Sequence, residues 1–145
     1  MSTITIKQVG ITGDLYRQVW QLREDILRQP LGLSLKDEDL GDDATDTIFA
    51  AIQDEKVIGC VIMHPVSATA VKLRQMAISP EVQGTGVGRL LVNAAGDWAK
   101  EKGFSEILMH ARMTAAGFYE KLGYRSKGEV FTEVTIPHVL MYKHI

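Results

Sequence analysis

The glycine-rich segment at residues 83–89 is the part of this sequence whose residue types and spacing most clearly indicate chemistry. It reads Gln83-Gly84-Thr85-Gly86-Val87-Gly88-Arg89. Three glycines at alternate positions remove every Cβ from one side of a tight turn, so backbone N–H groups can point into a common concavity. Residues 90–102 have a helical pattern, and the N-terminus of a helix offers unpaired N–H groups and a positive dipole end. The segment therefore predicts a binding site for an anion, most often a phosphate.

Two familiar nucleotide-binding motifs do not match this segment. The P-loop needs Lys followed by Ser or Thr after its last glycine, whereas Arg89 and Leu90 follow Gly88. The dinucleotide fingerprint that starts at Gly84 and Gly86 would place its third glycine at Arg89. A turn without a ligand is the remaining alternative, although three glycines for one turn weaken the chain through backbone entropy.

The elements that position this segment alternate between strands and helices. Residues 3–9 alternate apolar and polar side chains as in a half-buried strand, and an apolar helical face follows from Leu15 to Ile26 until Pro30. The other expected strands cover residues 47–52, 57–64, 70–78, 105–110, 124–130 and 136–143, and the other expected helices cover residues 90–102 and 114–122. Thr114 is expected to cap the second of these helices, and residues 131–134 are expected to separate the last two strands.

Short connections join the three strands from 47 to 78, which predicts an antiparallel meander, because a parallel pair needs a long crossover. Strand, helix and strand from 70 to 110 predict one right-handed crossover. The fold class is therefore α+β, a mixed, mostly antiparallel sheet of about seven strands with helices on both faces. The order of elements is β-α-(α)-β-β-β-α-β-α-β-β.

Composition restricts the partners of this chain. Its 145 residues, 46% hydrophobic and 23% charged, are those of a single globular domain over residues 1–145. The formal net charge is −2 without a basic patch, so we do not expect a nucleic acid partner. Cys60 is the single cysteine, which precludes an internal disulfide and fits a reducing cytoplasm. No apolar run approaches membrane-spanning length, so we expect no membrane partner and a cytoplasmic location.

The most acidic part of the chain, residues 36–46, allows two interpretations. Runs of charge are usually solvated loops. The alternative is an acidic lip, formed by Asp42, Asp43, Asp46 and their neighbours, that attracts a cationic substrate. The spacing of a calcium-binding loop is not met here, and we expect no metal.

Several motifs resemble those of the GNAT N-acetyltransferases. The pattern Gln83-x-x-Gly86-x-Gly88, after a strand that ends at residues 76–80, resembles the acetyl-CoA-binding motif of that family. Residues 116–124, with Tyr119 and Gly123-Tyr124, are similar to its second signature, and the order of elements agrees over nearly the whole chain. Residues 131–141 resemble the ElaA-like branch of the family.

The resemblance implies where acetyl-CoA, the co-substrate, would bind. Backbone amides from Gln83 to Arg89 would hold its pyrophosphate. Backbone groups of Met76, Ala77 and Ile78 would pair with the pantetheine arm as if it were an added strand. Arg112 stands where many family members have an asparagine that contacts the cofactor arm, so the resemblance does not extend to that contact. The guanidinium of Arg112 could instead reach a phosphate.

The resemblance also implies catalytic groups. Tyr119 matches the position of the general acid that protonates the sulfur of CoA, although a tyrosine that merely packs is the alternative. Glu133 and His138 are the candidates for the base, directly or through water, while a structural role for His138 is equally compatible with its place on a strand. His64 and His110 are expected to be structural.

The expected function is therefore acetyl transfer from acetyl-CoA to the primary amine of a small acceptor by direct attack. The acidic segment would suit a cationic acceptor. A non-catalytic acyl-CoA-binding sensor and a protein N-terminal acetyltransferase are the alternatives. Sheet edges near the C-terminus make a homodimer plausible.

Overall fold

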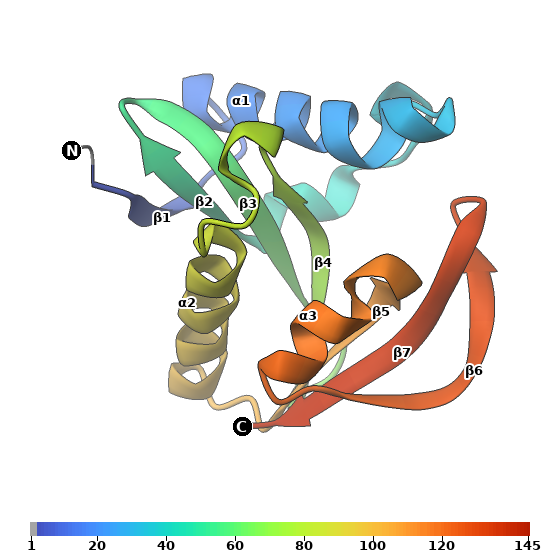
Figure 1. Ribbon diagram of the computed structural model, residues 1–145. Helices are drawn as coiled ribbons and strands as arrows, with labels where there is room; N and C mark the ends of the chain where they lie inside the picture. Colours follow the sequence, from blue (N-terminus) through green and yellow to red (C-terminus); the bar gives the residue numbers. More distant parts are fainter. Residues whose placement is uncertain (1–2) are drawn as a thin grey trace.

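The computed structural model describes residues 3–145 and contains a seven-stranded sheet in the order β1-β2-β3-β4-β5-β7-β6 (Figure 1). The strands are β1 (Thr5–Val9), β2 (Thr47–Gln53), β3 (Lys56–Pro65), β4 (Ala70–Ile78), β5 (Glu106–Arg112), β6 (Arg125–Glu133) and β7 (Ile136–His144). The α-helices are α1 (Asp14–Arg23), α2 (Val87–Glu101) and α3 (Ala116–Lys121). These elements confirm the expected α+β fold and its order.

Short helical turns connect the main elements. A π turn, η1 (Glu24–Arg28), continues directly from α1. The 3₁₀ turns are η2 (Gln29–Leu31), η3 (Leu35–Asp37), η4 (Gly41–Ala44), η5 (Pro80–Val82) and η6 (Met113–Ala115). The acidic segment expected to be a loop thus contains η3 and η4. Within the described residues, no helix combines the length and the apolar character that crossing a membrane requires.

Strands β4 and β5 form the only parallel pair of the described sheet, and they separate along their length. Their pairing is confined to Ala70–Lys72 against Glu106–Leu108. Beyond this point each strand stays paired on its outer side, β4 with β3 and β5 with β7. Figure 1 shows the resulting opening between the two halves of the sheet. The sheet remains stable around this gap because neither strand loses its outer partner.

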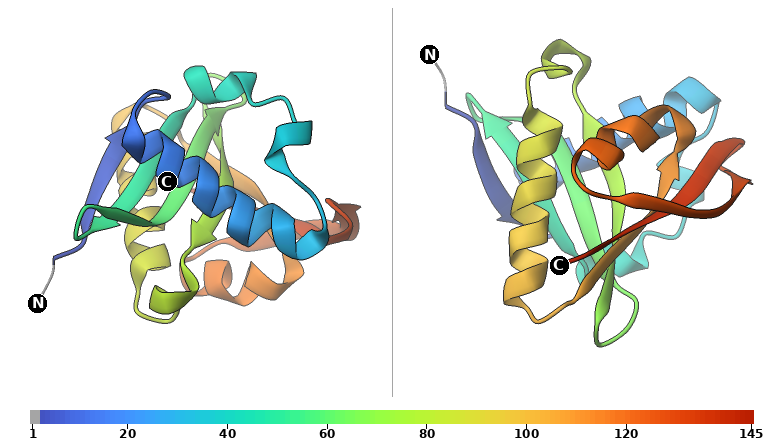
Figure 2. Two further views of the ribbon diagram at one scale, coloured as in Figure 1. Left: turned by 90° about the horizontal axis from the view of Figure 1, so that it is seen from above. Right: turned by 60° about the horizontal axis from the view of Figure 1, so that its bottom comes forward.

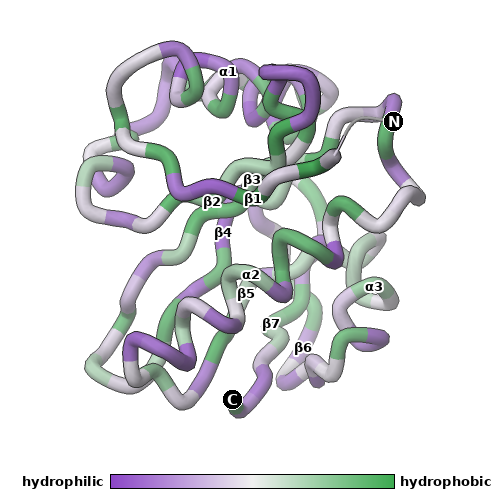
Figure 3. Tube along the Cα trace, turned by 90° about the vertical axis from the view of Figure 1, so that its left-hand side faces the viewer, coloured by the Kyte–Doolittle hydropathy of each residue, from purple (hydrophilic) through white to green (hydrophobic). Residues whose placement is uncertain are grey.

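The helices cover opposite faces of the sheet (Figure 2). Val19 of α1 packs in one apolar cluster with Ile48 and Ala50 of β2. The intervening residues of that strand, Phe49 and Ala51, belong to the second cluster, which contains α2 and part of α3. This alternation is the period-two pattern of a strand that is buried on both faces. Figure 3 shows the hydrophobic residues concentrated along the central strands and polar residues along the connections.

One glycine determines how closely α2 approaches the sheet. A Cβ built on Gly59 of β3 would lie 2.9 Å from Cδ1 of Leu91 and 3.1 Å from Cγ1 of Val87. Both side chains belong to the N-terminal half of α2 and are fully buried. The missing side chain therefore lets the first turns of α2 pack directly on β3, which positions the glycine-rich segment before that helix.

Two local expectations are wrong. The last strands are not separated by residues 131–134, because β6 extends to Glu133 and the chain reverses at Val134 and Thr135, which both have positive φ. Neither residue type favours that conformation, so the sequence carries no turn signal there. Thr114 does not cap α3, since it lies within η6 and the helix begins after Ala115 without a side-chain cap.

The packing of α2 gives a stability prediction with an internal control. Leu91 is completely buried and Leu90 beside it is 45% exposed. We expect Leu91→Ala to lower the free energy of unfolding by about 2–5 kcal/mol, through lost burial and a residual cavity. We expect Leu90→Ala to change it by less than about 0.5 kcal/mol. Denaturant unfolding measures both, and equal losses for the two variants would show that α2 does not pack as described.

Candidate active site

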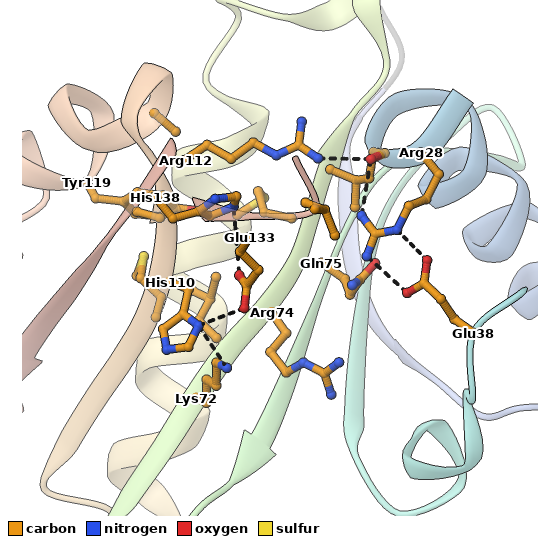
Figure 4. Close-up of a pocket in the computed structure, with 17 residues that line it drawn as sticks. Arg28, Glu38, Lys72, Arg74, Gln75, His110, Arg112, Tyr119, Glu133 and His138 are labelled. Atoms are coloured by element: carbon orange, nitrogen blue, oxygen red, sulfur yellow. Dashed lines mark hydrogen bonds and ion pairs between the residues drawn. The ribbon is translucent and has the colours of Figure 1, made fainter. Parts of the chain in front are cut away.

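A cavity of about 390 Å³ lies where β4 and β5 separate. Its walls come from the end of η1, from β4 and β5, from Tyr119 of α3, and from the hairpin that joins β6 to β7 (Figure 4). Glu133 and His138, both named from the sequence as base candidates, lie in this cavity together with Tyr119. The volume is within the range of sites for small molecules.

A bulge in β4 lies beside the cavity. Cys60 pairs with Ala77 and Ile62 with Arg74, so the two residues Gln75 and Met76 face the single residue between the partners. Gln75 has φ of 55°, an uncommon conformation for a residue other than glycine. Bulges of this kind bend a strand and re-aim its edge. The edge of β4 at residues 76–78 that would otherwise face β5 is therefore left unpaired.

The glycine-rich segment forms the expected turn at the start of α2. Gly84 and Gly86 have φ of 80° and 93°, and a Cβ at either position would meet no atom within 4 Å. The first hydrogen bond of the helix runs from the amide of Leu90 to the carbonyl of Gly86, at 3.1 Å. The amides of Val87, Gly88 and Arg89 therefore lie in the first turn, where a helix provides no acceptor.

The side chain of Gln83 fixes this turn to the end of β4. Its Nε2 donates to the carbonyl of Ile78 at 3.1 Å. None of residues 83–89 lines the cavity between β4 and β5. The glycine turn and the cavity are thus two separate places, and the unpaired edge at residues 76–78 directly precedes η5 and the turn.

Tyr119 reaches the cavity from the face of the sheet that α2 and α3 cover. Its side chain is 5% exposed and packs edge-on against Phe118 and Tyr124, with ring centroids 5.0 and 5.8 Å away. Its hydroxyl makes no hydrogen bond to any residue from 3 to 145. Burial, and to a smaller extent Tyr124, raises the pKa of the phenol. The hydroxyl is therefore protonated at neutral pH and can donate a hydrogen bond into the cavity.

Glu133 lies at the centre of a charged cluster in the cavity (Figure 4). Nδ1 of His110 is 3.0 Å from its Oε1, and Nε2 of His138 is 3.8 Å from its Oε2. Nζ of Lys72 lies 3.4 Å from Nδ1 of His110. Burial would raise the pKa of Glu133, but the hydrogen bond from His110 and the nearby positive charges outweigh it, so the pKa is lowered. Glu133 is therefore a carboxylate at neutral pH and accepts hydrogen bonds only.

His138 is held by its own hairpin. Its side chain is 4% exposed, and Nδ1 lies 2.9 Å from the carbonyl of Ile136, which requires a proton on Nδ1. The opposite nitrogen, Nε2, is the one that faces Glu133. The aromatic ring of Phe131 stacks on the imidazole with centroids 6.1 Å apart. His138 therefore has a structural contact on one side and a free nitrogen for proton transfer on the other.

Sequence reasoning missed His110 and Lys72 as members of this cluster. The alternation of apolar and polar side chains along β5 could have indicated that His110 faces the site. Ile107, Met109 and Ala111 pack in the cluster with α2, so His110 and Arg112 point to the other face. The partner of His110 is Glu133, which lies on β6 two strands away. That contact depends on the hairpin register, which the sequence alone did not predict.

Arg112 lies on the α1 side of the sheet and not beside the glycine turn. Its Nη2 donates to the carbonyl of Leu27 at 2.9 Å, across the opening between the two halves of the sheet. The residue lines the cavity that contains Glu133. The contact that this side chain makes is with the backbone of Leu27, and the suggested contact with a phosphate stays a prediction.

The acidic segment does not form an open lip, because several of its carboxylates are paired within the protein. Asp43 accepts from Nη1 of Arg23 at 2.8 Å and also binds the hydroxyl of Tyr16. Glu38 forms two hydrogen bonds with Arg28, at 2.6 and 3.2 Å. Asp46 contacts Nδ1 of His64 at 2.7 Å. These pairs fasten the segment from η3 to β2 against α1, η1 and β3.

The pair between Arg23 and Asp43 gives a second stability prediction. Their side chains are only 1% and 8% exposed, so removal of one partner leaves a buried charge uncompensated. We expect Asp43→Ala to lower the free energy of unfolding by about 3–5 kcal/mol. Asp42→Ala, at an exposed position, is the matched control and should change it by less than about 0.5 kcal/mol. Similar effects of the two changes in chemical denaturation would contradict a structural role for Asp43.

Comparisons with known proteins agree on one family. The sequence profile of the acetyltransferase (GNAT) domain matches residues 44–126. A Bacillus subtilis protein named as an acetyltransferase is 32% identical over 97% of this chain and 96% of its own length. A second protein of that organism, YyaT, is 31% identical over 98% of this chain and 97% of its own length.

Solved structures share the fold. A Lactobacillus plantarum protein named as an N-acetyltransferase superposes with a TM-score of 0.86 at 24% identity, over 97% of both chains. ElaA of Escherichia coli also has a TM-score of 0.86, at 17% identity, over 97% of this chain and 99% of its own. An Elizabethkingia anophelis acetyltransferase solved with acetyl-CoA bound has a TM-score of 0.74 at 18% identity, over 98% of both chains.

Proposed function

Because this chain belongs to the GNAT acetyltransferase family, we propose that it transfers the acetyl group of acetyl-CoA to the primary amine of a small acceptor by direct attack. One observation carries this proposal. The cavity where β4 and β5 separate holds a buried, protonated phenol and an ionised carboxylate, the two kinds of group that acetyl transfer to an amine requires.

The binding of acetyl-CoA would use backbone groups at two places. The unpaired edge of β4 at Met76, Ala77 and Ile78 can accept the pantetheine arm as an added strand. The free amides in the first turn of α2 can bind the pyrophosphate, favoured by the helix dipole. Gly84 and Gly86 leave that turn uncovered, since no side chain stands over it. The two places follow each other along the chain, so a single extended ligand can occupy both.

The amine must lose a proton before or during attack. Glu133 is the fixed anion of the cavity and attracts an ammonium group, and its carboxylate accepts the proton directly or through water. Nε2 of His138, 3.8 Å from that carboxylate, can relay the proton towards solvent. The nitrogen then attacks the thioester carbonyl, a C–N bond forms, and the carbonyl oxygen becomes an oxyanion.

Collapse of that intermediate breaks the C–S bond and releases the thiolate of CoA. The hydroxyl of Tyr119 donates its hydrogen bond, and then its proton, to the sulfur. The nitrogen loses its second proton as the intermediate collapses; one of the two protons restores the phenol by way of solvent and the other is released, so the products are the N-acetyl amine, CoA thiol and one proton. A sensor that only binds acyl-CoA would need no such donor, and the position of Tyr119, a buried side chain that lines the cavity, therefore favours the enzyme.

The size of the cavity supports a small acceptor over a protein N-terminus. The internal pairing of Asp43, Glu38 and Asp46 removes much of the basis for a purely cationic acceptor. A homodimer through the sheet edge near the C-terminus stays a prediction. That edge is β6, where Val130 is 55% exposed.

Tyr119 gives the direct test of the mechanism. We expect Tyr119→Phe to lower kcat by about 10²–10⁴-fold, the usual contribution of a positioned acid, while KM for acetyl-CoA changes little. Thiol release from acetyl-CoA against a panel of amines measures both. Tyr124→Phe is the matched control, because this second buried tyrosine packs on Tyr119 and does not line the cavity. Full activity in Tyr119→Phe would exclude the phenol as the acid.

The lowered pKa of Glu133 gives a pH prediction. A carboxyl whose pKa lies below its ordinary value, about 4.5, stays ionised at all higher pH values and loses its charge only as the pH falls towards that pKa. Between pH 6 and 9 we therefore expect Glu133→Gln to lower kcat/KM by a constant factor, about 10²-fold. The shape of the pH profile should not change. The pH profile of the unmodified enzyme could instead have a sloping limb between pH 6 and 9 that Glu133→Gln lacks. Glu133 would then titrate in this range, which would contradict its ionised state.

A further inference from the structure

The cavity beside Glu133 contains more positive than negative side chains. Its lining includes four basic residues, Arg28, Lys72, Arg74 and Arg112, and two carboxylates, Glu38 and Glu133. Glu38 pairs with Arg28, Arg74 lies 3.9 Å from Asp46 behind the cavity wall, and Glu133 is influenced by the charge of Lys72. A positive excess therefore remains on the walls, although the acidic segment of the chain lies next to the site.

Two guanidinium groups converge on one backbone carbonyl. Nη2 of Arg112 lies 2.9 Å and Nη1 of Arg28 lies 3.1 Å from the carbonyl oxygen of Leu27. Figure 4 shows Arg112 extending from the β5 side of the cavity to meet Arg28 on the opposite side. A carbonyl oxygen has two lone pairs and can accept both hydrogen bonds, but it carries no charge to balance two cations.

The two arginines differ in how their charges are balanced. Arg28 has the bidentate partner Glu38. Arg112 is half-buried, and between residues 3 and 145 it has no carboxylate within 4.0 Å. Burial, together with the charge of Arg28, lowers the pKa of Arg112, which is the behaviour of a cation without a counter-ion. A planar guanidinium in this state is suited to bind a carboxylate or phosphate oxygen through two donors.

We infer that the acceptor amine carries an anionic oxygen group, which binds between Arg112 and Arg28 while its amino group lies at Glu133. The inference rests on the proposed function and specifies the substrate class of the same site. Positive and negative groups thus stand in one cavity, and a ligand with an amine and an anionic group would complement both.

A brace between the halves of the sheet is the simplest other role for Arg112. Such a brace needs only a donor to the carbonyl of Leu27, and a neutral side chain would supply it without the cost of burying a charge beside Arg28. The phosphates of CoA are a poor alternative partner, because the free amides of the glycine turn lie on the α2 side and residues 83–89 do not line the cavity. The guanidinium is therefore best explained by an anion in the acceptor site.

Matched pairs of acceptors test the inference. Thiol release is measured with glycine against glycinamide, β-alanine against its amide, and phosphoethanolamine against ethanolamine. A second readout is the dissociation constant of each N-acetyl product in the presence of CoA, which needs no turnover. We expect the anionic member of at least one pair to have the higher kcat/KM and the tighter product complex by about 10–100-fold, the usual effect of a charge-assisted contact. The pair that shows it distinguishes a carboxylate from a phosphate.

Arg112→Gln should reduce this preference to within about 3-fold and leave the KM for acetyl-CoA nearly unchanged, because glutamine retains a donor but no charge. Arg125→Gln, an exposed arginine of β6, is the control and should retain the preference. Equal use and equal binding of neutral and anionic members, or a preference that survives in Arg112→Gln, would overturn the inference. If no amine is acetylated, the proposed function fails, and the binding constants of the products still show whether the arginines select an anion.

Discussion

The separation of β4 from β5 after Lys72 is the constraint on which the rest of this structure depends. Backbone groups along the separated edges give up their mutual hydrogen bonds, and such groups are costly when they stay unpaired away from water. The fold limits this cost, because β3 and β7 pair with the outer sides of both strands. A ligand that presents amide groups to the gap can satisfy the remaining groups. The opening therefore forms the cavity and, under the proposed function, would also hold an extended co-substrate.

The gap connects the two faces of the sheet, and each face contributes different chemistry. Tyr119 reaches it from the side of α2 and α3, where the glycine turn lies. His110 and Arg112 project towards the side of α1. Arg28 and Glu38 complete the cavity wall on that side. Donor and acceptor substrates can thus approach from opposite faces and meet at one place. Buried ion pairs such as Arg23 with Asp43 hold the α1 side in position, which is why the acidic segment serves the structure more than the ligand.

Much of this arrangement is predictable from the sequence, since it depends on local pattern. The strand-like runs with short connections in residues 47–78 and the glycines from 84 to 88 predict the meander, the turn and the helix that follows. The features that escaped prediction depend on contacts between distant segments. Val134 and Thr135 adopt left-handed conformations only because the paired strands force the turn, and Gln75 does so in a bulge that β3 imposes. The role of Arg112 likewise follows from the carbonyl of Leu27, 85 residues away.

Hydrogen exchange with and without CoA tests the central claim, that the gap and the glycine turn form one site for an extended co-substrate. Amides exchange more slowly when they gain hydrogen bonds or are removed from water. The account predicts that CoA slows exchange in peptides that cover residues 76–78 and 87–89, and leaves the peptides of β1 and β2 unchanged. Tight binding of CoA without protection in residues 76–89, or with protection confined to another face, would contradict it.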